Sequence, residues 1–137
     1  MDIRNIHHVS VTVTDLALSR KFYREILELP EIDRPDFPFP GAWFQLGASQ
    51  QIHLIVHTDP TMRGDKGVDT RDNHFAVRVG SYRQALEFLR AKGYREDAGA
   101  LDLKKMRINA QSTAGVPQIF ILDPDRHVIE INAETLD

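Results

Sequence analysis

The chain has 137 residues, a net charge of −3 and no cysteine, and its length is typical of one compact domain with its own core. The small negative charge provides no basic surface for nucleic acid or an anionic membrane, and the lack of cysteine excludes disulfides, thiolate metal sites and a cysteine nucleophile. With neither a signal-like N-terminal segment nor an apolar run of membrane-spanning length, we expect a single cytoplasmic domain, residues 1–137.

The first predicted strand, residues 6–13, alternates between an apolar and a polar face. The apolar face carries Val9, Val11 and Val13, and the polar face carries His8, Ser10 and Thr12. A helix is expected over about residues 16–28, with Asp15 as its N-cap and Pro30 beyond its end. Its apolar stripe is predicted to comprise Leu18, Phe22 and Ile26, with Tyr23 and Leu27 beside them.

Residues 30–41 contain four prolines and are predicted to form a loop. Phe37 and Phe39 in this loop either close over a pocket or pack on the surface. Two short strands, about 42–46 and 51–56, should follow as a hairpin. In the second strand the predicted apolar face is Ile52, Leu54 and Val56, and the opposite face is Gln51, His53 and Ile55. The polar, turn-rich residues 58–71 are predicted to link two halves of the chain.

The second half repeats this plan with an offset of 66 residues, so that His74 aligns with His8. A strand opening with His74 precedes a helix that Ser81 and Gln84 should cap and that Gly93 should end. Residues 97–115 are weakly patterned, with one strand predicted near 103–109. The chain ends in a predicted hairpin with strands 118–122 and 127–132.

Four potential metal ligands occupy the polar faces of these strands: His8, His53, His74 and Glu130. A single histidine or glutamate on a strand is more often structural or solvated than a ligand. Four of them at related places in two repeats favour one shared site. Imidazole and carboxylate suit a divalent ion such as Zn²⁺, Ni²⁺, Mn²⁺, Co²⁺ or Fe²⁺, and strands hold such ligands firmly.

Other polar residues are assigned by strand face or position. We assign substrate binding to Trp43, Gln45, Arg78 and Asn132, and Ser10, Thr12 and Gln118 are further candidates for cavity walls. Arg78 suits a carboxylate, phosphate or enolate, although a surface ion pair explains it equally well. The remaining histidines, His7, His57 and His127, are interpreted as structural, with His57 the strongest exception.

The chain resembles the vicinal oxygen chelate superfamily, which includes glyoxalase I, bleomycin-resistance proteins and extradiol dioxygenases. The matching motifs are residues 6–9, 14–16, 22–29, 41–44, 51–54, 72–74, 123–125 and 128–131. The resemblance implies an α+β fold of two tandem βαβββ modules, about 5–57 and 72–134, forming a curved mixed sheet around a metal cavity, often in a homodimer. It also implies the metal ligands His8, His53, His74 and Glu130.

Two positions depart from the family pattern. Glyoxalase I enzymes commonly carry glutamate at the position of His53, so this chain keeps one ligand carboxylate. The usual glycine after Asp-Pro-Asp is Arg126 here, which changes the turn rather than the site.

The resemblance implies a metal-dependent lyase or isomerase similar to glyoxalase I. Such an enzyme acts on a small-molecule substrate with adjacent oxygens through an enediolate, and Glu130 would be its general base. The alternatives are a fosfomycin-type thiol transferase, an extradiol dioxygenase with ferrous iron, and a non-enzymatic resistance protein that sequesters a small molecule. An intact ligand set counts against the last of these.

Overall fold

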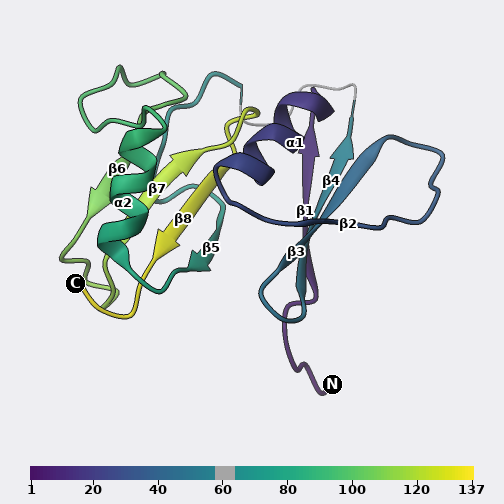
Figure 1. The fold of residues 1–137 in the computed structure, drawn as a ribbon, viewed down its shortest axis with the longest axis horizontal. Helices are drawn as coiled ribbons and strands as arrows, with labels where there is room; N and C mark the ends of the chain where they lie inside the picture. The colour runs from purple at the N-terminus through teal and green to yellow at the C-terminus, as the bar shows by residue number, and fades with distance from the viewer. Residues whose placement is uncertain (58–63) are drawn as a thin grey trace. The chain divides into compact units, whose positions relative to one another are not determined.

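The computed structural model describes residues 1–57 and 64–137, which fall into two compact units, Met1–Met62 and Arg63–Asp137 (Figure 1). Each unit is a four-stranded mixed sheet with one helix, so the fold is α+β. Each follows the order strand, helix and three strands, and this confirms the predicted duplication. No helix in the described ranges is long and apolar enough to cross a membrane.

The first unit has the strand order β1-β4-β3-β2, with β1 parallel to β4 and the other neighbours antiparallel. Its elements are β1 (His8–Val13), α1 (Leu16–Glu25), β2 (Glu31–Ile32), β3 (Gly41–Leu46) and β4 (Gln50–Val56). The register pairs His53 with Ser10 on one side and with Trp43 on the other. Paired residues point to the same face of a sheet, so the predicted polar face is confirmed. The opposite face carries the buried residues Val11, Val13, Phe44, Ile52 and Leu54.

The second unit has the matching order β5-β8-β7-β6, with β5 parallel to β8 and the other pairs antiparallel. Its elements are β5 (His74–Arg78), α2 (Tyr82–Ala91), β6 (Arg107–Asn109), β7 (Gln118–Leu122) and β8 (Val128–Asn132). One face is apolar and carries the buried residues Ile119, Ile121, Ile129 and Ile131. The other face carries Glu130 in a row with Ala76 and Phe120.

The helix caps confirm the sequence prediction, whereas the length and orientation of the first helix do not. Asp15 accepts a hydrogen bond from the backbone N–H of Leu18, and Ser81 accepts one from that of Gln84. The first helix ends at Glu25 rather than near residue 28, because the chain turns through Glu28, which has a φ of +52°. Leu18, expected in the apolar stripe, is 56% exposed, whereas the next residue, Ser19, is buried together with Phe22 and Tyr23.

Two further expectations need correction. The proline-rich segment, predicted as a loop, contains β2, which pairs Glu31 with Phe44 and Ile32 with Trp43. Pro30 directly precedes this strand, and its carbonyl accepts a hydrogen bond from Gln45, but it has no N–H with which to extend the ladder. The strand predicted near 103–109 is only Arg107–Asn109, since Asp102 and Lys105 close a turn directly before it.

Gly41 lies too close to the backbone of the neighbouring strand to carry a side chain. A Cβ atom added there would overlap the carbonyl oxygen of Leu54 on the neighbouring strand and press on the Arg34 guanidinium. We expect Gly41→Ala to lower the free energy of unfolding by about 1–3 kcal/mol, because a backbone carbonyl cannot move aside without disturbing the ladder. Urea denaturation measures the change. Gly80→Ala is the control, because nothing lies within 4 Å of a Cβ there; equal stability of the two variants would contradict the expectation.

Candidate metal centre

The first unit brings His8 and His53 together. Their rings are stacked with centroids 4.2 Å apart and planes 12° from parallel, and the Trp43 indole stacks on the other side of His53 at 4.0 Å. The contact follows from register, because His53 lies between Ser10 and Trp43 on the polar face. His53 is thereby enclosed, with 8% of its surface exposed.

His53 is held as a neutral imidazole. Its Nε2–H donates to Oε1 of Gln51 at 2.8 Å, which leaves the Nδ1 lone pair available. Burial, together with the neighbouring charges of His8, His7 and Arg34, lowers the pKa of His53 from 6.5 to about 4. At neutral pH the ring therefore carries no proton on its second nitrogen, the form in which histidine binds metals.

His7 also contacts this pair, although the sequence indicated a structural role for it. Its Nδ1 lies 2.9 Å from Nδ1 of His8, so one ring donates to the other. His7 precedes β1, where the alternation of strand faces no longer applies, and this is why its position could not be predicted. The contact engages Nδ1 of His8 and leaves Nε2 as the remaining ligand atom of that ring.

The second unit brings His74 and Glu130 together. The Nδ1–H of His74 donates to the backbone carbonyl of Asp72 at 2.7 Å, and this fixes the proton on Nδ1. The Nε2 atom lies 3.4 Å from Oε2 of Glu130, which is 6% exposed. When the ring is neutral, the lone pair of Nε2 faces the carboxylate oxygen, an unfavourable approach that a cation between the two atoms would relieve.

The spacing of these two atoms suits a shared divalent ion. Metal–nitrogen and metal–oxygen bonds of about 2.0–2.2 Å place neighbouring ligand atoms about 2.8–3.1 Å apart in octahedral sites and about 3.3–3.6 Å apart in tetrahedral sites. The observed 3.4 Å fits the tetrahedral spacing. The backbone hydrogen bond to Nδ1 is also the support commonly given to a metal-binding histidine. The residues of the second unit therefore fit a divalent metal.

A chain of hydrogen bonds orients the Glu130 carboxylate. Asn132 donates to Oε1 of Glu130 at 2.7 Å, and the Nε–H of Arg78 donates to the Asn132 amide oxygen at 2.6 Å. Arg78 also lies 3.9 Å from Glu134. Arg78 and Asn132, both assigned to substrate binding from the sequence, thus hold the carboxylate with Oε2 toward His74. Strand alternation alone could not indicate this role.

The other two residues assigned to substrate binding lie in the first unit. The Trp43 indole stacks on the His53 ring, because the two residues are paired on the polar face of the sheet. Gln45 donates from its amide to the carbonyl oxygens of Gly47 and Gln50, each at 3.2 Å, so its amide nitrogen closes the β3–β4 turn.

The pair in the first unit fits a metal less directly. The lone pairs of an imidazole lie in the ring plane, so those of two parallel rings run side by side and do not converge on one point. Binding one ion through both His8 and His53 requires the stacked rings to tilt apart. Among the residues that the structure describes, no group of three or more histidine, aspartate or glutamate side chains is arranged to hold a metal. The four-ligand site therefore stays a prediction built from two observed pairs.

Comparisons with known proteins agree with this fold. The family model of the Glyoxalase/Bleomycin resistance protein/Dioxygenase superfamily matches residues 5–131. A putative glyoxalase family protein from Bacillus anthracis has a similar structure, with a TM-score of 0.74, 22% identity and 97% of each chain covered.

Two similar structures carry more specific names. The fosfomycin resistance protein FosX from Listeria monocytogenes has a TM-score of 0.67 at 22% identity, covering 98% of this chain and 97% of that one. A lactoylglutathione lyase from Agrobacterium tumefaciens has a TM-score of 0.67 at 16% identity, covering 97% and 96%. At these identities the likeness establishes the fold alone.

Proposed function

Because the chain belongs to the Glyoxalase/Bleomycin resistance protein/Dioxygenase superfamily, we propose that it is a divalent-metal-dependent lyase or isomerase of the glyoxalase I type. Its substrate is a small molecule with two adjacent oxygens. The proposed ligands are His8, His53, His74 and Glu130, which together hold one ion of Zn²⁺, Ni²⁺, Mn²⁺, Co²⁺ or Fe²⁺. The observation that carries the proposal is the 3.4 Å approach of His74 Nε2 to Glu130 Oε2, with the His74 tautomer already fixed.

The proposed chemistry is a proton transfer between neighbouring carbons. A bound divalent ion supplies Lewis acidity, which stabilises the negative charge that develops on adjacent substrate oxygens. Glu130 accepts the carbon-bound proton and returns it to the next carbon, as a general base and then a general acid. Asn132 keeps Oε1 occupied, so Oε2 is the atom that moves the proton, and for this step it would have to loosen from the ion that it helps to hold. Trp43 provides an apolar wall for the substrate beside His53.

A second candidate function is a fosfomycin-type thiol transferase that uses only His8, His74 and Glu130 as ligands. The stacking of His53 between His8 and Trp43 favours it, because those parallel rings do not direct their lone pairs to one point. FosX from Listeria monocytogenes, with its similar fold, supports this alternative only as an analogy. For either function we also propose a homodimer in the cytoplasm.

A substrate panel with metal-loaded protein separates these functions. The protein is stripped of metal, reloaded with each of the five ions in turn, and assayed with hemithioacetals, with catechols and oxygen, and with fosfomycin plus thiols. We expect isomerisation of a hemithioacetal that depends on the added metal. Thiol addition to fosfomycin without hemithioacetal turnover would replace the leading proposal by the second one. Ring cleavage of a catechol with Fe²⁺ alone would point to the dioxygenase reaction.

Asn132 provides a test of how Glu130 is held. Asn132→Leu removes the donor to Oε1 and is expected to weaken Zn²⁺ binding by about 10–100-fold, the usual effect of losing a hydrogen bond that orients a metal ligand. Calorimetric titration of the metal-free protein measures it. Asn109→Leu is the control, since the Asn109 amide bonds only Gln118, at 3.4 Å, among the described residues. Equal Zn²⁺ affinities in both variants would show that Asn132 does not support the ligand.

A further inference from the structure

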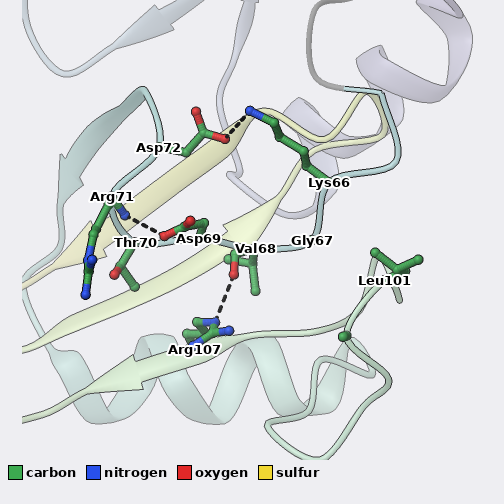
Figure 2. A pocket seen from close by; sticks show the side chains of 10 residues that line it. Lys66, Gly67, Val68, Asp69, Thr70, Arg71, Asp72, Leu101 and Arg107 are labelled. Atoms are coloured by element: carbon green, nitrogen blue, oxygen red, sulfur yellow. Dashed lines mark hydrogen bonds and ion pairs between the residues drawn. The ribbon is translucent and has the colours of Figure 1, made fainter.

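The second unit contains a cavity of about 760 Å³, within the size range of small-molecule sites (Figure 2). The loop before β5 forms one side, and the start of β6 and the turn preceding it form the other. Its lining residues are Lys66 to Asp72, Ala100, Leu101 and Arg107. Most of this loop belongs to the segment predicted as a linker, so the sequence alone gave no reason to expect a site here.

The cavity walls are held in place by the rest of the unit. Val68, which is buried, packs with Phe120, Leu122 and Val128. The Nε–H of Arg107 donates to the Val68 carbonyl at 2.8 Å (Figure 2). Arg126 joins the two sides of the cavity, because its guanidinium donates to the carbonyl oxygens of Lys66 and Leu101 at 3.2 and 2.9 Å. These contacts fix the two sides of the cavity relative to each other.

Strand register places this cavity on the same face of the sheet as Glu130. Arg107 pairs with Phe120, and Phe120 pairs with Glu130, so the three side chains form one row across β6, β7 and β8. Two strand spacings separate the backbones of Arg107 and Glu130, a distance of roughly 10 Å. Phe120 lies between them in this row, and its ring packs at 82° to the His74 ring with the two ring centroids 5.7 Å apart.

The charge of the cavity favours an anion. Lys66, Arg71 and Arg107 outnumber Asp69 and Asp72. Three of these charged groups already have partners, since Lys66 lies 3.6 Å from Asp72 and the Asp69 carboxylate accepts the backbone N–H of Arg71. Arg107 uses only Nε, and its terminal nitrogens have no partner in residues 1–57 and 64–137. A guanidinium anchored in this way presents two parallel donors to a carboxylate or phosphonate.

We propose that this cavity binds the oxyanion group of the substrate, a carboxylate or a phosphonate, through the terminal nitrogens of Arg107. Val68 and Leu101 contact the apolar part of the same molecule. The inference rests on the proposed function, because it makes the substrate a small acid whose reacting carbon lies toward Glu130. It names a substrate class that the His74–Glu130 pair alone does not specify.

The test measures anion binding without metal or turnover. Malonate and methylphosphonate are titrated separately into the metal-free protein, and binding is followed by calorimetry and by NMR shifts of the residue 66–72 amides. We expect one site for at least one probe, with affinity at least 10-fold weaker in Arg107→Met. Tighter binding of malonate would identify a carboxylate, and tighter binding of methylphosphonate a phosphonate. No binding of either probe to the wild type would overturn the inference and leave the proposed metal chemistry untouched.

A second variant removes the ambiguity that Arg107 also holds the loop. Leu101→Asp adds a negative charge at the exposed cavity wall and leaves the Arg107–Val68 hydrogen bond in place. We expect it to lower the affinity for each anion by a factor similar to that of Arg107→Met. Arg83→Met, an exposed arginine on α2, is the matched control and should bind the anions as the wild type does. If Leu101→Asp binds the anions normally, or if Arg83→Met loses as much affinity as Arg107→Met, the cavity is not the binding site.

Discussion

Replacing Glu130 by glutamine is expected to lower the rate of metal-dependent proton transfer by about 10²–10⁴-fold, the usual contribution of a general base. Glutamine keeps the size of the side chain and can still accept a hydrogen bond from Asn132. It has no basic oxygen to take a carbon-bound proton. The loss should therefore appear in the chemical step, and kcat/KM with the best hemithioacetal of the substrate panel measures it.

Because Glu130 is also a proposed ligand, the assay of Glu130→Gln must be run at saturating metal, with bound metal verified by elemental analysis. Glu134→Gln is the control. Its carboxylate belongs to the same unit and neighbours Arg78, but its side chain is 86% exposed. Turnover at the wild-type rate by metal-loaded Glu130→Gln would remove Glu130 as the base.

Replacing His74 by alanine is expected to lower the affinity for a divalent metal by on the order of 10²-fold or more. This loss is larger than the one typical of a residue that only holds a ligand by a hydrogen bond. His74 supplies the lone pair that faces Glu130, so its loss leaves one ligand atom where two lay 3.4 Å apart. Calorimetric titration with Zn²⁺ measures the affinity. His57→Ala serves as the control, because His57 is exposed and follows β4 outside the predicted ligand set.

The same reasoning predicts weaker binding for His8→Ala, whereas His53→Ala decides between the two candidate functions. Under the leading proposal His53→Ala loses affinity as the other ligand variants do. Under the three-ligand alternative it binds metal as the wild type does. A His74→Ala variant with unchanged Zn²⁺ affinity would exclude the proposed centre altogether.

Strand alternation was enough to select the two pairs in the candidate site. In the strands of His8 and His53, the alternate positions hold apolar residues such as valine and isoleucine, which face the opposite side. The two histidines therefore share the polar face, and the same alternation places Glu130 on the polar face of its sheet. Strand alternation does not predict the hydrogen bonds that orient these side chains. The hydrogen bond from His74 to the Asp72 carbonyl is set by the backbone path of a loop, and the His7–His8 contact lies outside the strand.

Arg107 shows why part of the site could not be predicted. It lies in a strand of three residues, too short for a periodic pattern, within a stretch rich in turns. Its place in the row with Phe120 and Glu130 emerges only from the pairing register. Val68 was missed for a related reason, since one apolar residue in a polar segment gives no signal until its packing partners are known.

If the two pairs bind a single ion, the sole tryptophan of the chain, Trp43, detects that ion directly. Trp43 stacks on His53 in the first unit, so its fluorescence reports metal binding there, whereas His74 belongs to the second unit. Zn²⁺ titration of the wild type, followed by Trp43 fluorescence, should give one ion per chain, with the transition shifted to at least 10²-fold higher Zn²⁺ in His74→Ala. Two ions per chain, or a Trp43 transition unmoved by His74→Ala, would contradict the shared centre.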